Sequence, residues 1–336
     1  MQSGRKVAVS LDELKELIEK RLAKLKYNEQ EIQVIKQVIL YSQLVDGTQG
    51  LLKLLVDGVG SITQPNPSQY APHVIYDGGV ALRVDGGSSL GMVVLDFATN
   101  KAIERATELG LAMVGVFHSC SSTGALGYYV EKIASKGLVG IVSSGSTPTV
   151  AAFGSAERNF GTNPLAYAIP GPQEPLVVYD ASTSAMSFWG VKSYEMENKP
   201  LPDDVALDSQ GKTTRDASLA QVLKTFGGAK GSGISFLLEF LNGALVGSAS
   251  ARGDTSNWGS FLLAFQPDIF HLGKEQVEQN TMELVDRIRA CRPCEGYSQV
   301  FLPGERSRAK RKAILDQNWI SLSAQVIESL RILVND

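Results

Sequence analysis

The sequence predicts an α/β protein in which helical segments from both ends of the chain flank a large mixed sheet. Apolar residues recur at helical spacing near both termini, and strand and helix patterns alternate through the middle. The 336 residues can bury a substantial core. We expect an N-terminal helical segment at 1–70 to pack with a C-terminal helix at 306–336, and residues 71–305 to form the main domain.

Composition excludes several functional classes. The net charge of −3 argues against bulk electrostatic binding to nucleic acid. No stretch is long and apolar enough to span a bilayer, and the N-terminus lacks a signal-peptide core. Three cysteines do not make a disulfide framework. The sequence therefore predicts a cytoplasmic protein with no membrane or nucleic-acid partner.

The first segment predicts two helices, each with a capping signal. Ser10 followed by Glu13 forms a capping box before a run of leucines. Asn28 with Glu31 repeats the signal, and the second helix is expected to end near Leu44.

The middle of the chain predicts alternating strands and helices. We expect Thr99 to cap a helix that Gly110 ends, and Asp180 to end a strand. The predicted strands are residues 91–97, 111–117, 138–143 and 176–179, and a helix is predicted at 124–136.

The last third predicts a polar excursion near 192–220 and then more helix. The glycine-rich stretch 227–233 leads into an apolar helix at 234–245. A charged helix at 274–289, a short strand at 299–302 and one closing helix at 314–334 are expected to follow.

The stretch HSCSSTG, residues 118–124, lies between a predicted strand end and a helix start. Proteins with α/β folds commonly bind ligands at such positions. Amides at a helix N-terminus lack partners and favour anions. The loop is therefore a candidate part of the active site.

Six stretches in order resemble the malate/L-lactate dehydrogenase family of the non-Rossmann type, which also includes ureidoglycolate dehydrogenases, diketogulonate reductases and cyclic-imine reductases. The resemblance covers nearly the whole chain. The stretches are FGTNPLAYAIP, PLVVYDASTSAMSFWG, LPDDVALDSQGKTTRDA, GGAKGSG, NWGSFLLAFQPDIF and FLPGE.

The resemblance implies a non-Rossmann NAD(P)-binding fold, an NAD(P)-dependent oxidoreductase and a homodimer with its site near the subunit interface. Residues 71–305 would bind cofactor and substrate. The absence of G-x-G-x-x-G after a strand agrees with this. Cofactor contacts are implied at Ser146, Asp180, Ala181, Ser182, Lys230, Gly304, Glu305 and Arg306.

Two of these positions also make physical sense. Lys230 lies in a glycine-rich turn before a helix, where amides and an ammonium could hold a phosphate. Asp180 at a strand end could orient the nicotinamide amide or the substrate. Taken alone, Lys230 would read as a solvated surface lysine and Asp180 as a helix cap.

The sequence departs from the family pattern at its proton donors. A Ser-His-Gly motif is replaced by Thr48, Gln49 and Gly50, and a family arginine by Lys53, which would bind a substrate carboxylate. A second family histidine, in the Ser-x-His-x-Gly loop, corresponds to Ser122. A positioned acid contributes about 10² to 10⁴-fold to proton transfer, so ketone reduction is weakened as a prediction.

Three explanations remain open. His118 could reach the site in a differently shaped loop. Asp180, or a water held by Thr48, Gln49 and Ser122, could relay the proton. The substrate could instead be an imine, which carries its own proton, with Asp180 stabilising the cation.

We therefore predict hydride transfer to a small 2-imino or 2-oxo acid, with the imine favoured. The alternatives are a 2-hydroxy-acid dehydrogenase with a relocated proton relay and an inactive cofactor-binding pseudoenzyme. NADP is weakly favoured over NAD by the basic run that begins at Arg306. Cys291 and Cys294 are read as free thiols, and no metal site is predicted.

Overall fold

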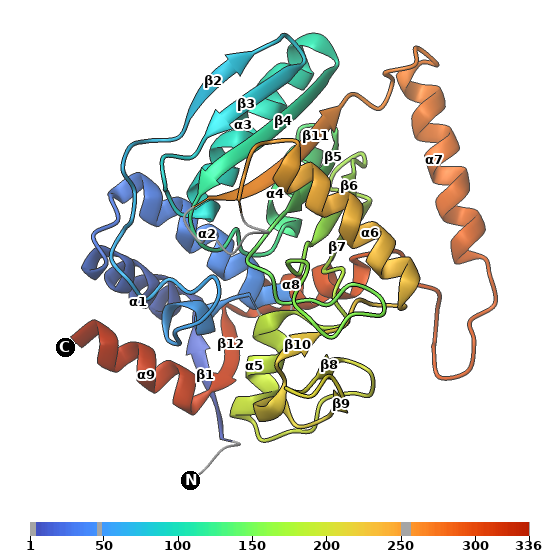
Figure 1. Cartoon of the computed structure of the whole chain (residues 1–336). Helices are drawn as coiled ribbons and strands as arrows, with labels where there is room; N and C mark the ends of the chain where they lie inside the picture. Colours follow the sequence, from blue (N-terminus) through green and yellow to red (C-terminus); the bar gives the residue numbers. More distant parts are fainter. Residues whose placement is uncertain (1–4, 46–48, 250–256, 336) are drawn as a thin grey trace.

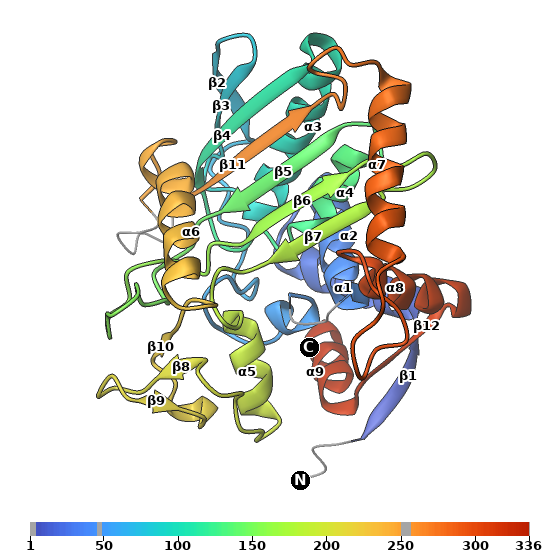
Figure 2. The same ribbon diagram turned by 90° about the vertical axis from the view of Figure 1, so that its right-hand side faces the viewer.

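A seven-stranded mixed sheet lies at the centre of the molecule (Figure 1, Figure 2). The computed structural model describes residues 5–45, 49–249 and 257–335. Strands β3 and β4 are parallel, and the other neighbouring pairs are antiparallel. In spatial order the strands are β2 (His73–Asp77), β3 (Ala81–Asp85), β4 (Leu111–Ser119), β11 (Trp258–Phe265), β5 (Val139–Ser144), β6 (Leu165–Ile169) and β7 (Val177–Ala181).

This pairing brings several strand ends to one edge of the sheet. Strand β11 is antiparallel to both β4 and β5, so β4 and β5 point the same way. Strand β7 shares that direction because β6 is antiparallel to both β5 and β7. The segments that follow β4, β5 and β7 therefore meet at one edge, together with the start of β11.

Helices cover both faces of the sheet. Helices α3 (Gly91–Leu109) and α4 (Gly127–Ala134) pack against one face, with α2 (Glu29–Val45) outside them. Helix α6 (Ala229–Glu239) and the π-helical turn η3 (Phe240–Ala244) cross the other face (Figure 1). Helix α7 (Lys274–Arg289) lies at the periphery and buries only Val285 among its residues.

The strand predicted at 91–97 is wrong, because these residues form the first turns of α3. Met92, Val94 and Leu95 are all buried, so the helix start is apolar on several sides. A short apolar run of this kind cannot be told from a buried strand by periodicity alone. Thr99 consequently lies inside the helix, whereas Gly110 ends it in a left-handed conformation as expected.

The two ends of the chain lie side by side. Strand β1 (Lys6–Ser10) pairs antiparallel with β12 (Trp319–Ser323), and α1 (Leu11–Lys24) packs against α9 (Ala324–Asn335). The single closing helix predicted at 314–334 is therefore wrong, since α8 (Glu305–Gln317) ends before β12. Ile320 and Leu322 alternate with exposed neighbours, which is the period-two signature of a strand.

The predicted N-terminal caps are present, one complete and one half formed. Asn28 and Glu31 exchange backbone-to-side-chain hydrogen bonds of 2.9 and 3.0 Å. Ser10 accepts from the Glu13 amide at 3.1 Å. The Glu13 carboxylate pairs instead with Arg331 of α9, which ties the two termini together.

A small three-stranded sheet lies in the region predicted as an excursion (Figure 2). Helix α5 (Phe188–Met196) leads into it, and Leu201 and Ala206 are fully buried there. Its strands are β8 (Ala206–Leu207), β9 (Thr213–Thr214) and β10 (Val222–Leu223), and the short helix η2 (Ala217–Leu219) lies between β9 and β10 in the chain. Another short helix, η1 (Leu51–Leu54), follows α2.

The strand predicted at 299–302 is absent, because this part of the described chain is a loop. The amide of Leu302 bonds the side chain of Glu305 at 2.8 Å rather than a neighbouring strand. None of the helices that the structure describes is both long and apolar enough to cross a membrane.

Candidate active site

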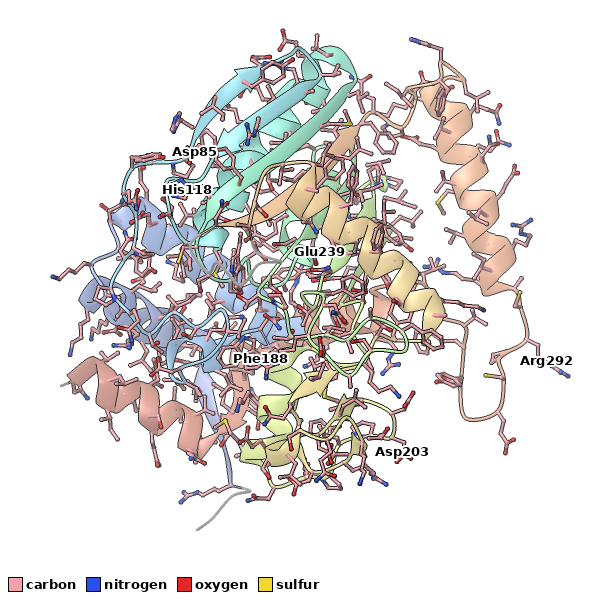
Figure 3. All side chains as sticks on the ribbon, viewed as in Figure 1. Asp85, His118, Phe188, Asp203, Glu239 and Arg292 are labelled. Carbon is pink, nitrogen blue, oxygen red and sulfur yellow. The ribbon has the colours of Figure 1, made fainter. Side chains whose placement is uncertain are left out.

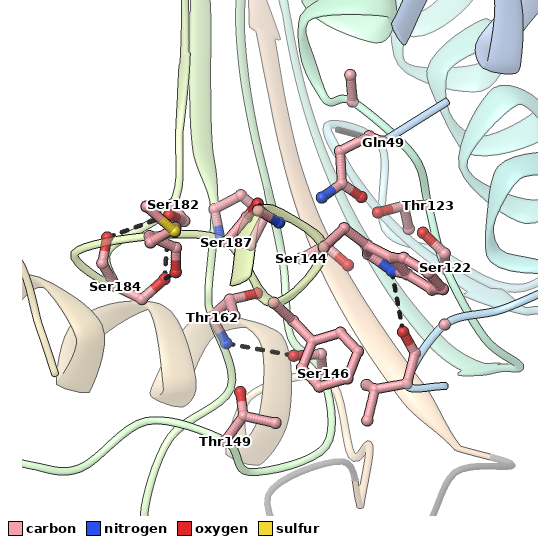
Figure 4. Close-up of a pocket in the computed structure, with 18 of the residues that line it drawn as sticks. Gln49, Ser122, Thr123, Ser144, Ser146, Thr149, Thr162, Ser182, Ser184 and Ser187 are labelled. Carbon is pink, nitrogen blue, oxygen red and sulfur yellow. Dashed lines mark hydrogen bonds between the residues drawn. The ribbon is translucent and has the colours of Figure 1, made fainter. Parts of the chain in front are cut away.

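A cavity of about 630 Å³ opens at the edge where the strand ends meet (Figure 4). Its walls come from the loops after β4, β5 and β7, the start of α5 and the segment around η1. This volume is in the range typical of pockets for small ligands. The sheet topology thus brings residues far apart in the sequence into one site.

Asp180, near the end of β7, supplies a carboxylate to this cavity. One of its oxygens accepts a hydrogen bond from the amide of Gly127 at 2.7 Å. Gly127 is the first residue of α4, where helix amides carry partial positive charge. Asp180 therefore caps a helix and also lines the cavity, so its two readings from the sequence are compatible.

Ser122 and Gln49 form a neutral polar wall across the cavity (Figure 4). The Ser122 hydroxyl oxygen accepts from the Gly124 amide at 2.9 Å, which leaves its proton available to another acceptor. Gly60 has a φ of +75°, and a Cβ there would lie 3.1 Å from the Ser122 Cβ and 3.7 Å from the Lys53 Nζ. The wall consequently accepts no larger residue at position 60 without displacement.

Lys53 provides positive charge in the cavity wall. Its side chain is 1% exposed, and Nζ lies 3.5 Å from the carbonyl oxygen of Gly60. Nζ also lies 4.9 Å from the ring centre of Trp189, which in turn donates to the carbonyl of Val59 at 3.1 Å. These contacts hold the ammonium over an aromatic platform, an arrangement that stabilises a cation.

The opposite wall is rich in hydroxyl groups. Ser146 accepts from the amide of Thr162 at 3.3 Å. Thr149 Oγ1 and Trp258 Nε1 are buried and have no hydrogen-bond partner among the described residues. Buried polar atoms of this kind need partners, so this wall suits a ligand with uncharged polar groups.

His118 does not line the cavity. Its Nδ1 lies 2.9 Å from Asp85 Oδ1, and its Nε2 lies 2.9 Å from the hydroxyl of Ser88. Tyr70 donates to the other Asp85 oxygen at 3.0 Å. Figure 3 shows Asp85 and His118 together at the ends of β3 and β4, apart from Glu239 and Phe188. Both ring nitrogens of the histidine are thus engaged outside the site.

A family model described as malate/L-lactate dehydrogenase matches residues 9–331. The chain belongs to the malate/L-lactate dehydrogenase family. The family prediction from the sequence is therefore confirmed, and the protein is an oxidoreductase.

Two curated members of this family illustrate its range. Ureidoglycolate dehydrogenase (NAD(+)) of Escherichia coli O157:H7 is 30% identical over 234 residues, which cover 67% of this chain and 66% of that protein. Delta(1)-pyrroline-2-carboxylate reductase 1 of Burkholderia ambifaria is 32% identical over 287 residues, which cover 82% and 84%. The names of these relatives thus include both a dehydrogenase and a reductase.

Solved structures share the whole fold. A dehydrogenase from Sinorhizobium meliloti has a TM-score of 0.87 and 28% identity and covers 99% of this chain and 100% of that one. Malate dehydrogenase from Entamoeba histolytica has the same fold, with a TM-score of 0.87 at 22% identity and 98% coverage of both chains. The predicted non-Rossmann fold of the malate/L-lactate dehydrogenase type is confirmed.

Six of the positions that the family resemblance implied, together with Ser122, lie in the cavity. Lys230 is an exposed residue in the first turn of α6, outside the cavity lining but close in sequence to Phe226, which does line it. Thr48 lies outside the described residues. The seven in the cavity are Gln49, Lys53, Ser122, Ser146, Asp180, Ala181 and Ser182.

Gly304, Glu305 and Arg306 lie at the start of α8, beside the beginning of β7. The carbonyl of Pro303 accepts from the amide of Val178 at 3.2 Å. Arg306 lies 6.0 Å from the ring of Phe301 and borders two surface hollows of about 470 and 800 Å³. The structure does not bring these three residues into the main cavity.

Several cavity residues were missed from the sequence. Phe188 and Trp189 lie in the quoted stretch PLVVYDASTSAMSFWG, which could have pointed to them. Trp258 lies in the quoted stretch NWGSFLLAFQPDIF, whereas Gly60 carried no local signal, because only tertiary packing brings it here. The described thiols are unpaired; Cys291 and Cys294 are exposed and Cys120 is partly buried.

Proposed function

We propose that the protein reduces the C=N bond of a small 2-imino acid with a nicotinamide cofactor. The observation that carries this proposal is the charge content of the cavity wall. Among the described lining residues, Asp180 is the only carboxylate, Lys53 is the only cationic side chain, and no histidine is present. Such a wall suits a substrate that already carries its proton.

The cavity has features that fit a nicotinamide cofactor. Its hydroxyl-rich wall offers partners to a carboxamide and a ribose, and the buried Thr149 Oγ1 and Trp258 Nε1 lack partners of their own. Lys230 at the start of α6 and the helix amides beside it would suit a phosphate. When bound, the cofactor supplies the hydride. A guanidinium can bind a 2′-phosphate in a bidentate manner, so a cofactor that reached Arg306 beyond the main cavity would be NADP.

The mechanism follows from four side chains. Lys53 binds the carboxylate of the substrate through its ammonium. Asp180 lies where a protonated imine would be stabilised by Coulomb attraction. Ser122 and Gln49 donate hydrogen bonds that orient the substrate. No side chain needs to transfer a proton during the hydride step, since the imine nitrogen already holds one.

The cavity also favours a monocarboxylate. Only one cation lines it among the described residues, whereas a dicarboxylate such as malate would need a second. Met186, Phe188 and Trp189 form an apolar section of wall near Lys53. An alkyl or cyclic imine would bury its carbon atoms there. Relatives named pyrroline-2-carboxylate reductases support the same substrate class.

The second candidate is a 2-hydroxy-acid dehydrogenase with a relocated proton relay. Relatives named ureidoglycolate and sulfolactate dehydrogenases favour it. In this case Asp180, or a water held by Gln49 and Ser122, would carry the proton. The chemistry is harder because a hydroxyl without a base beside it is a poor acid at neutral pH.

The deciding experiment follows the oxidation of NADPH and NADH with a matched substrate panel. Pyruvate and 2-oxoglutarate are tested alone and with ammonia or methylamine, beside pyrroline- and piperideine-2-carboxylate. We expect turnover only where a C=N bond is present. Rapid turnover of the bare keto acids would overturn the imine proposal. Binding of cofactor without any turnover would indicate an inactive relative.

We also propose that a second copy of the chain covers the outer face of α6. Phe236 and Leu237 of α6 and Phe240, the first residue of η3, are 68%, 53% and 48% exposed. The helix starts beside the cavity, so a homodimer formed here would place the site near the subunit interface. Exposed apolar faces of this kind commonly mark protein–protein contacts.

Sedimentation equilibrium tests the dimer. We expect wild type to be dimeric and Phe236→Asp to be largely monomeric, because a buried charge without a partner is costly. Ile332→Asp on α9 is the matched control, since Ile332 is 58% exposed on another face. A monomeric wild type, or a Phe236→Asp variant that stays dimeric, would contradict this interface.

A further inference from the structure

We propose that Glu239 is a positioning residue whose carboxyl group fixes the turn at residues 161–163, behind the cavity wall. Glu239 does not line the cavity, and nothing in the proposed reaction uses it. The inference rests on the proposed function only where cofactor binding is the readout.

Two hydrogen bonds connect Glu239 to this turn. Its Oε2 accepts from the side-chain amide of Asn163 at 2.7 Å and from the backbone amide of Gly161 at 3.4 Å. Asn163 is fully buried and has a φ of +37°, near the left-handed region that few residues adopt. Such backbone conformations persist only when the surroundings hold them. Glu239 supplies part of that restraint.

The same turn positions polar groups of the cavity. The amide of Thr162 donates to the hydroxyl of Ser146, and both residues line the cavity. A Cβ at Gly161 would lie 2.6 Å from Asn163 Oδ1 and 2.7 Å from the Ser146 hydroxyl. The turn is therefore packed tightly between Glu239 on one side and Ser146 on the other, so a shift in one moves the other.

The surroundings of the carboxyl group favour its neutral form. Both hydrogen-bond donors to it are uncharged, and Oε1 is buried without a partner among the described residues. Asn163 Oδ1 is likewise a buried acceptor without a donor. Burial raises the pKa of the Glu239 carboxyl, although the bonds from Asn163 and Gly161 oppose this. A proton on Glu239 would supply the donor that these atoms lack.

The end of α6 is built so that Glu239 faces inward. The helix changes to a π-helical turn directly after it, marked by a bond of 2.9 Å from the Leu245 amide to the Phe240 carbonyl. Within this turn Asn242 Oδ1 accepts from the hydroxyl of Ser143 in β5 at 2.7 Å. Interruptions of this type are frequent at functional sites. Here the turn fastens the helix to the sheet behind the cavity.

Infrared spectroscopy of the full-length protein tests the charge state without any ligand. We expect wild type at neutral pH to show the C=O stretching band of a protonated carboxyl group. Glu239→Gln should lack this band, whereas Glu275→Gln, at an exposed position in α7, should retain it. A wild-type spectrum without the band, or one unchanged in Glu239→Gln, would overturn the neutral carboxyl.

Cofactor binding tests the positioning role. Glutamine keeps an acceptor for Asn163 and adds a donor, so Glu239→Gln should bind NADPH, titrated by fluorescence, within about threefold of wild type. Glu239→Ala should raise the Kd about tenfold or more, because it leaves buried groups unpaired, and should affect KM more than kcat. Gly161→Ala should disturb the same turn from the other side.

Two results would contradict positioning: wild-type affinity in Glu239→Ala, or a loss in Glu239→Gln as large as in Glu239→Ala. If alanine at this position prevents folding, Gly161→Ala and Glu239→Gln still give the comparison. Failure of the proposed function looks different, because wild type itself would then bind neither NADPH nor NADH while the infrared band remained.

Discussion

His118, near the end of β4, and Ser122, in the loop that follows, lie four positions apart, yet their surroundings differ. The histidine bonds Asp85 and Ser88 through its two ring nitrogens and faces away from the cavity. The serine hydroxyl accepts one hydrogen bond from a backbone amide and lines the cavity, where its proton can still be donated. The imidazole is therefore kept out of the cavity, and a hydroxyl group stands in its wall.

This contrast explains what the cavity can do with a proton. A ketone substrate needs an acid beside the developing alkoxide, and the described lining residues offer a carboxylate, an ammonium and neutral side chains. A protonated imine needs a nearby negative charge instead, which Asp180 provides. The following predictions test whether the difference between the two regions is functional.

The largest effect is expected at Asp180. Asp180→Asn removes the negative charge but keeps an oxygen that can accept from Gly127, so α4 stays capped. We expect kcat/KM for pyrroline-2-carboxylate to fall about 10²–10³-fold, the usual cost of losing one preorganised electrostatic group. The Kd for cofactor should change little.

Steady-state kinetics of Asp180→Asn and His118→Ala, measured with the same substrate, compares the two regions directly. That variant should stay within about threefold of wild type, since His118 lies outside the cavity. If His118→Ala lost more activity than Asp180→Asn, the His118 region and not the cavity around Asp180 would be the catalytic one.

An intermediate effect is expected when a histidine is put back. Gln49→His places a titratable group in the cavity wall at the position where the family resemblance implies a histidine. Reduction of pyruvate should rise about tenfold relative to imine reduction, less than the full contribution of a well-positioned acid. Gln49→Leu is the control and should show no gain. Equal keto-acid rates in all three proteins would mean that the missing histidine does not limit the reaction.

The sequence predicted the parts of this arrangement that depend on local patterns. The capping box at Asn28 and Glu31, the strand at 111–117 and the helix at 274–289 all depend on neighbouring residues, and the structure contains them. Strand β12 was missed although Ile320 and Leu322 alternate with exposed residues, because a longer helical pattern surrounds it. The helical repeat of the surrounding residues masked the period-two alternation of this short strand.

Long-range contacts could not be predicted in the same way. The distance between the Lys53 ammonium and the Trp189 ring depends on packing between segments more than 130 positions apart. The bond from Asn163 to Glu239 crosses 76 positions, and no local pattern marks either residue as a pair. The family resemblance supplied many cavity positions, but the partners of those residues came from the fold alone.

The smallest effect concerns stability in acid and depends on the His118 region. Burial raises the pKa of the Asp85 carboxyl, but hydrogen bonds from the Gly87 amide, His118 and Tyr70 together bring it below its usual value. A lowered pKa contributes stability that is present above the unfolded-state value of about 3.9 and is lost as the pH falls through the folded-state value. His118→Ala removes one of these bonds, so less of this contribution remains to be lost.

Thermal unfolding from neutral pH to below the pKa of Asp85 measures this difference. His118→Ala should melt a few degrees below wild type at neutral pH, because Asp85 and Ser88 each lose a partner. The gap should narrow in acid, where protonation of Asp85 weakens the same contacts in wild type. Ser88→Ala keeps the bond between His118 and Asp85 and should therefore keep the wild-type pH dependence. A gap that stays constant or widens in acid would mean that the Asp85–His118 bond does not stabilise the fold, and the histidine would then need another explanation.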